Sequence, residues 1–166
     1  MLCVALLAQA GECDYLMHVD SAHLTHYRVQ LQARNASLDG VCAIKLIDGS
    51  IKGVVVNDFG IKAFAFIISP DRKKVKLQDV IHMLDHWYIK RVIKNDLKLL
   101  FNATTSNISN QDKKTKIEIL DDGTKKMTNS KYHIQYLFTL APETEQEEPE
   151  NQNDEPQLII EDETTE

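Results

Sequence analysis

The stretch that decides the fold is Lys52–Phe101, which reads KGVVVNDFGIKAFAFIISPDRKKVKLQDVIHMLDHWYIKRVIKNDLKLLF. Its first part holds two runs of β-branched and aromatic residues, which favour strands, and Asn57–Gly60 between them favours a turn. Side chains alternate between the two faces of a strand. The bulky face of the second run therefore carries Phe64, Phe66 and Ile68. The smaller face carries Ala63, Ala65 and Ile67.

The second half of this stretch has its apolar residues at helical spacing. The pattern extends from Leu77 to Phe101 and shifts near Asp85–Trp87, which predicts one bent helix or two helices. A strand with a bulky apolar face, followed at once by an apolar-striped helix, indicates that the two cover each other.

Outside this stretch the pattern is that of further strands. Apolar and polar residues alternate from Tyr27 to Arg34, which predicts a half-exposed strand. After a turn expected over Asn35–Gly40, Val41–Ile47 and Ile51–Val56 complete an antiparallel meander. A hairpin is predicted around Asp121-Asp122-Gly123, and the alternating residues of the last strand run from Tyr132 to Leu140. The sequence thus predicts an α+β fold built on an antiparallel sheet covered by one or two helices.

Length and charge indicate one domain with appendages. The chain has 166 residues and a net charge of −6. We expect a single domain over residues 14–141 and an acidic, disordered tail over residues 142–166, which contains neither Lys nor Arg. The rest of the chain is mildly basic but lacks a basic stripe interleaved with aromatics, so nucleic acid is not expected as a partner.

The N-terminus predicts export. Residues 1–13 form an apolar leader, and MLCVALLAQA ends in an Ala-x-Ala pattern typical of a secretory cleavage site. Cys13 follows as a candidate for lipidation, although Glu12 stands where a small residue is usual. The alternative is an ordinary N-terminal segment packed on a cytoplasmic domain.

Catalytic motifs are missing from the sequence. No nucleophile motif or phosphate-binding glycine loop is present, so neither an enzyme nor a cofactor is predicted. His82 and His86 with Asp85 superficially resemble a zinc-peptidase helix, but we interpret both imidazoles as solvent-facing. The three cysteines have no metal-binding spacing, and Cys42 reads as a small buried hydrophobe. The apolar surface of sheet and helix remains, and it forms either a dry core or a groove for an acyl chain.

Three segments carry a resemblance to a known family: Tyr27-x-Val29-x-Leu31 with Gly40, Val55–Phe66, and the helical run Val80–Leu97. They resemble the lipoprotein-carrier and lipoprotein-receptor superfamily of Gram-negative envelopes (the LolA/LolB type), and more narrowly its short LolB-like proteins of unassigned role. In those relatives a strand containing N-E-x-G leads into F-D-F. Asp58 stands here for the Glu, and Ala65 stands for the Asp.

The resemblance implies a sheet curved like half a barrel, with helices over its concave face and Trp87 plugging that face. It also implies a non-enzymatic protein of the periplasm or the inner face of the outer membrane, whose partners are lipid acyl chains or lipoproteins, with a membrane surface as a further partner. The expected apolar groove is lined by Phe59, Ala63, Phe64, Ala65, Phe66, Ile68, Leu84 and Trp87.

Two rival functions stay open at this point. One is a structural or interaction protein with a dry core that acts through its acidic tail. The other, ranked third, is a zinc-dependent hydrolase using His82 and His86.

Removal of residues 142–166 should leave the folded domain intact, because these residues bury too little apolar surface to offset the entropy of ordering them. The melting temperature of the truncated chain, compared with that of the full chain, measures this. A fall of several degrees would show that the tail is part of the folded unit.

Overall fold

The computed structural model describes residues 14–33, 36–108 and 114–142. The leader, with its lipidation candidate Cys13, and the acidic tail from residue 143 onward lie outside the described residues. Within them the chain forms β1 (Thr25–Ala33), β2 (Ala36–Ile47), β3 (Ser50–Asn57), β4 (Lys62–Ile68), β5 (Val75–Gln78), β6 (Thr115–Ile119), β7 (Lys125–Asn129) and β8 (Ile134–Leu140). A short 3-10 turn, η1 (His82–Leu84), precedes the helix α1 (Trp87–Asn102).

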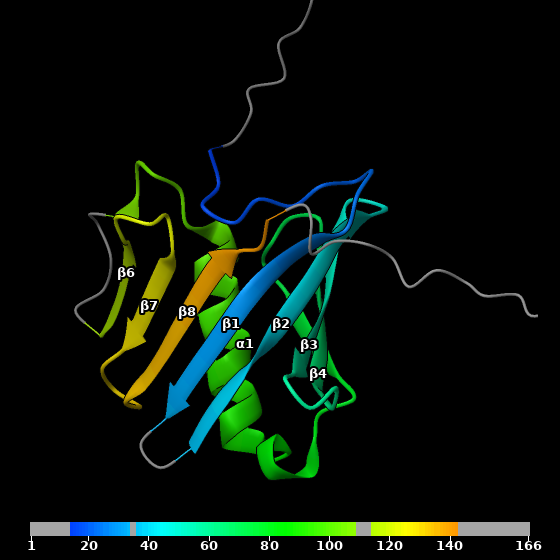
Figure 1. Cartoon of the computed structure of the whole chain (residues 1–166), viewed down its shortest axis with the longest axis vertical. Helices are drawn as coiled ribbons and strands as arrows, with labels where there is room; N and C mark the ends of the chain where they lie inside the picture. Colours follow the sequence, from blue (N-terminus) through cyan, green and yellow to red (C-terminus); the bar gives the residue numbers. More distant parts are fainter. Residues whose placement is uncertain (1–13, 34–35, 109–113, 143–166) are drawn as a thin grey trace, which may run out of the picture.

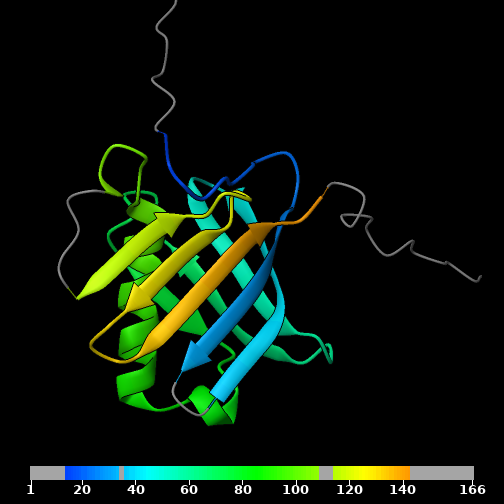
Figure 2. The same ribbon diagram turned by 60° about the vertical axis from the view of Figure 1, so that its left-hand side comes forward.

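The strands form one antiparallel sheet with the order β5-β4-β3-β2-β1-β8-β7-β6. The sheet is curved and is not closed into a barrel, and α1 crosses its concave face between the β5 side and the β6 side (Figures 1 and 2). The predicted fold class is therefore confirmed: an α+β domain with an antiparallel sheet and one covering helix, preceded by a single short 3-10 turn.

The hydrophobic core fills the space between the concave face and α1. Phe64, Phe66 and Ile68 are all buried, which confirms that the bulky face of β4 points inward. The ring of Phe66 lies 5.6 Å from that of Phe101 on the helix. Gly53 on β3 leaves room for the Phe66 ring, since a Cβ at Gly53 would lie 2.3 Å from its Cζ.

The segment before β1 closes one end of this core. Leu16 and Met17 are buried, and the Leu16 amide donates to the carbonyl of Ala103 just after α1 (2.9 Å). The guanidinium of Arg72 stacks over the ring of Tyr15 at 3.4 Å. Its Nη1 donates to the Phe101 carbonyl, so the last turn of α1 is fixed by a cation, as helix C-termini favour.

Two predicted boundaries were wrong. A turn was expected over Asn35–Gly40, but its described residues, 36–40, are part of β2, which begins at Ala36. Gly40 therefore lies inside the sheet. A Cβ at this position would lie 2.0 Å from the Val56 carbonyl oxygen, so the close approach of β2 to β3 requires glycine. The last strand begins at Ile134 rather than Tyr132, which lies in the turn before it.

The helix predicted from Leu77 begins only at Trp87. Leu77 belongs to β5 and pairs with Phe66. Val75 and Leu77 alternate with exposed residues, as the side chains of a short strand do. A short apolar run fits both periods, so periodicity alone could not separate them. The break expected near Asp85–Trp87 is confirmed.

A β-bulge changes the face of Ala63. The pairing of β3 with β4 shifts between Val55 and Val56, and Ala63 is the extra residue on β4. Ala63 is consequently buried beside Phe64, whereas Ala65 and Ile67 lie on the opposite face. The assignment of Ala63 to the small outer face was therefore wrong.

One carboxylate is buried between helix and sheet. Asp96 on α1 is only 2% exposed. Its Oδ1 accepts a hydrogen bond from Asn129 Nδ2 (2.8 Å), and its Oδ2 accepts one from Tyr136 Oη (2.8 Å). Burial raises the pKa of Asp96, while the two hydrogen bonds oppose that rise. The three side chains fix the rotation of α1 over β7 and β8.

Phe66→Ala should lower the free energy of unfolding by about 3–5 kcal/mol, as truncation of a packed aromatic does. The matched control is Phe59→Ala, which removes the same atoms from a side chain that is 89% exposed. Because Phe59 buries little surface, that change should stay within about 0.5 kcal/mol. Urea unfolding of both variants measures the difference, and similar losses would contradict this description of the core.

Asp96→Asn should remove one component of the dependence of stability on pH. The pKa of Asp96 is raised in the folded state, so the folded protein holds this proton more tightly than the unfolded chain. The stability from this group is complete below its ordinary pKa of 3.8 and is lost as pH rises through the raised pKa. Unfolding free energies from pH 3 upward should therefore fall across that window more in the native protein than in the variant. Parallel curves would contradict the prediction.

Candidate binding surface

The eight groove residues expected from the sequence do not line one groove. Four of them, Ala63, Phe64, Phe66 and Ile68, are buried in the core. Leu84 in η1 is partly buried and packs against that core. Ala65 lies on the outer, convex face of β4, because it alternates with Phe64 and Phe66.

The remaining two, Phe59 and Trp87, point into solvent. Trp87 is 73% exposed at the start of α1. The expectation that it plugs the concave face is not met, because Ile93, Leu97 and Leu100 on the buried side of the helix occupy that position.

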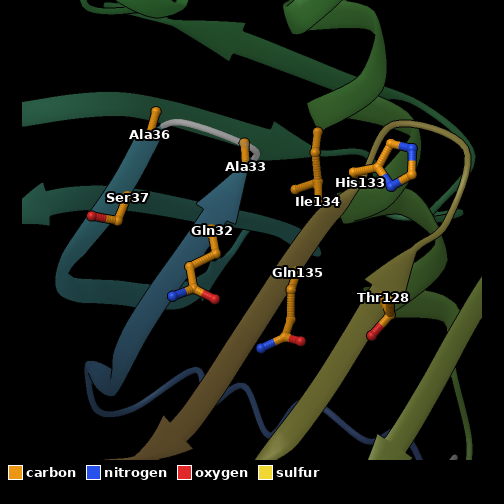
Figure 3. A pocket seen from close by; sticks show the side chains of 8 residues that line it. All are labelled: Gln32, Ala33, Ala36, Ser37, Thr128, His133, Ile134 and Gln135. Carbon is orange, nitrogen blue, oxygen red and sulfur yellow. The ribbon is translucent and has the colours of Figure 1, made fainter.

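A polar hollow of about 530 Å³ lies where β1, β2, β7 and β8 come together at one end of the sheet (Figure 3). Four of its side chains form a row across the paired strands: Ser37, Gln32, Gln135 and Thr128. The hollow is completed by Ala33, Ala36, His133 and Ile134. Amides, hydroxyls and an imidazole suit a polar ligand rather than an acyl chain.

A second hollow, of about 500 Å³, lies over the middle of the convex face. Its lining includes Arg28, Asp39, Asp58 and Asp122. Arg28 Nη1 donates to Asp58 Oδ1 (3.2 Å), and both side chains are more than half exposed, so this ion pair contributes little. Neither of these two hollows is an apolar channel between sheet and helix.

The most prominent apolar feature is on the surface. Among the described residues, the large hydrophobic side chains with more than half of their surface exposed fall in two short segments. They are Phe59 (89%) and Ile61 (52%) in the β3–β4 turn, with Met83 (56%), Trp87 (73%) and Tyr88 (53%) where η1 leads into α1. We name these five residues the apolar rim.

Local hydrogen bonds hold the first rim segment in shape. Asn57 Oδ1 accepts from the amides of Phe59 (3.1 Å) and Ile61 (2.8 Å), and Gly60 has a φ of 77°, which a glycine adopts without strain. The turn thereby presents Phe59 outward.

Further contacts join the residues that follow the first rim segment to those that precede the second. The Ile81 amide donates to the Ala63 carbonyl (2.8 Å), and Lys62 Nζ pairs with Asp79 (2.8 Å). Both segments lie in the lower half of the molecule in Figures 1 and 2. The Trp87 and Tyr88 rings meet edge to face at 6.1 Å. The rim is therefore an ordered feature of one end of the fold.

The titratable groups beside the rim are exposed side chains. His82 lies in η1 and His86 just before α1, where it stacks on Tyr88, and both are exposed. The ammonium of Lys90 lowers the pKa of Asp85, which stays a solvated carboxylate. In the part of the chain that the structure describes, no three His, Cys, Asp or Glu side chains gather as a metal site.

Cys42 behaves as the sequence predicted. It is fully buried in β2, and burial raises the pKa of its thiol to about 12. A thiol held in this neutral form is a packing group rather than a nucleophile.

Comparisons of the chain with protein-family models, with curated proteins and with solved structures gave no match. The described residues contain no helix suited to spanning a bilayer.

Sequence reasoning found Phe59 and Trp87 but not the surface they belong to. A signal was present in NDFG, because a phenylalanine in a turn of polar residues and glycine has no strand face on which to be buried. The position of η1 depends on β5. This strand was not predicted from the sequence, because the periodicity assigned Leu77 to a helix.

Proposed function

We propose that this protein is a non-enzymatic binding protein that holds acyl chains of a lipid or lipoprotein at the apolar rim. One observation carries the proposal: the five most exposed large hydrophobic residues of the described chain lie in two linked segments at one end of the fold. Two or three large hydrophobic side chains exposed together in one short segment are typical of contacts with partners or lipid, whereas single exposed hydrophobics are ordinary.

The packing of the core favours a surface site over an internal one. Tyr27, Phe66 and Phe101 are among the largest fully buried side chains and fill the space under the helix. A ligand at the rim leaves this packing unchanged. Each methylene buried contributes about 0.8 kcal/mol, and association costs at least several kcal/mol. A rim that covers part of one chain therefore gives micromolar to millimolar affinity, which suits a protein that passes its ligand on.

The expected cellular setting is the envelope, at the periplasm or the inner face of the outer membrane. The leader-like residues 1–13 and the resemblance to LolB-like proteins support it. Both supports come from sequence patterns, so the setting is part of the proposal.

A second candidate is an interaction protein with a dry core, favoured by the filled space between sheet and helix. In that case the rim would contact a protein. The acidic tail, through which we expected such a protein to act, lies outside the described residues.

A fluorescent fatty-acid probe distinguishes the candidates. The full chain should bind the probe with micromolar to millimolar affinity, and Trp87 emission should shift to the blue because its indole leaves water. Phe59→Ser with Met83→Ser should weaken binding about tenfold or more, because both substitutions remove apolar contact area.

The matched control is Ile119→Ser with Leu140→Ser, which changes two other exposed hydrophobics, each 46% exposed, outside the rim. This control should keep the native affinity. Absence of probe binding up to millimolar concentration with fixed Trp87 emission would reject acyl binding and favour the interaction protein. Equal loss in both double variants would reject the rim as the site.

A further inference from the structure

The outer face of α1 carries cations without acidic counterparts. Its exposed residues include Arg91, Lys94 and Lys98, and the single acid of the helix, Asp96, points inward and is 2% exposed. Lys90 is engaged with Asp85. Within the described residues, no ion pair engages the other three cations.

These cations lie in line with one exposed aromatic side chain, that of Trp87. Trp87, Arg91, Lys94 and Lys98 follow one another at intervals of four, three and four, so they share one face of the helix. At 1.5 Å per residue the line is about 16 Å long. We name Trp87, Arg91, Lys94 and Lys98 the basic helix face.

We propose that the basic helix face docks on the surface of a bilayer rich in anionic lipid. Lys and Arg beside an anionic leaflet are attracted to its headgroups, and a Trp on the same face enters the interfacial region. A row of cations that begins at Trp87 matches this combination of headgroup charge and interfacial region. An acidic protein or a nucleic acid would use the charge alone.

The position of the first described residues fits docking of the basic helix face on a membrane. The Asp14 carbonyl accepts from the Thr105 amide (3.3 Å), and Leu16 bonds to Ala103, so the first described residues lie beside the C-terminal end of α1. Cys13, the residue at which we expect lipidation, immediately precedes Asp14 in the sequence. One acyl chain together with a basic patch is sufficient for stable membrane attachment, whereas one chain alone is marginal.

The docking proposal goes beyond acyl binding at the rim, because it concerns attraction between headgroups and the side of the helix. Trp87 belongs to both surfaces, but the three cations belong only to the basic helix face. Substitution of these three cations therefore tests docking and leaves all the rim residues unchanged.

The experiment measures cosedimentation of the full chain with vesicles. Phosphatidylcholine vesicles containing 30% phosphatidylglycerol should bind it, pure phosphatidylcholine vesicles should not, and 0.5 M salt should release it because salt screens the attraction. The triple variant Arg91→Gln, Lys94→Gln, Lys98→Gln should lower the partition coefficient on the order of a hundredfold, since each cation contributes about a factor of five.

The matched control makes the same change of charge on the opposite side of the molecule. Lys45 in β2, Lys52 in β3 and Lys76 in β5 lie on the convex face, and Lys45 pairs directly with Lys52. The triple variant of these three to Gln should bind vesicles like the native protein. Thermal melts of both variants show that they are folded.

Three results would overturn the proposal: equal binding to neutral vesicles, equal losses in the two triple variants, or full competition by polyglutamate at the same charge concentration. Failure of docking is distinguishable from failure of the proposed function, because fatty-acid probe binding is measured without vesicles. The helix triple variant should retain that binding.

Discussion

The rings of Phe66 and Phe101 lie 5.6 Å apart and join β4 to the last turn of α1. This contact requires the absence of a side chain at Gly53, where a Cβ would overlap the Phe66 ring. A sheet of this curvature would expose its bulky concave face to water without the helix. On the helix, Ile93, Leu97 and Leu100 are buried in the same core. Each element therefore depends on the other for burial.

Apolar packing alone would leave the rotation of the helix loosely specified, because many aliphatic arrangements have similar energies. The hydrogen bonds of Asp96 with Asn129 and Tyr136 make one rotation preferable, since any other would leave a buried carboxylate without donors. That rotation points Arg91, Lys94 and Lys98 outward. The buried acid thus determines which face of α1 is basic, although it takes part in neither proposed binding surface.

Because the interior is filled, both proposed binding sites lie on the surface. An acyl-binding protein with an internal cavity and one with an external rim differ in what they can retain: a cavity excludes water from the whole chain, whereas a rim covers part of it. The rim and the basic helix face meet at Trp87, where η1 gives way to α1. A protein lying on a membrane by the helix would hold Trp87 at the lipid surface, so the two proposals share that residue.

The sequence by itself determined the features that depend on local pattern. The alternation of side chains predicted that Phe64, Phe66 and Ile68 share one face, and all three are buried. The Asp-Gly pair predicted the β6–β7 turn, in which Gly123 has a φ of 81°. The shift of the apolar stripe predicted the break before Trp87. Together these indicated an antiparallel sheet covered by a helix. They are set by dihedral preferences and periodicity within a few residues.

Only the tertiary structure decided the features that depend on distant neighbours. Leu77 joined a strand because Phe66 offered a pairing partner, and a bulge opposite Val55 turned Ala63 into the core. Trp87 lies outside because aliphatic residues one to three turns later fill the concave face. The hydrogen bond from Ile81 to Ala63 likewise joins the chain after the first rim segment to the chain before the second. Such contacts join residues remote in sequence, and no local periodicity encodes which of them will meet.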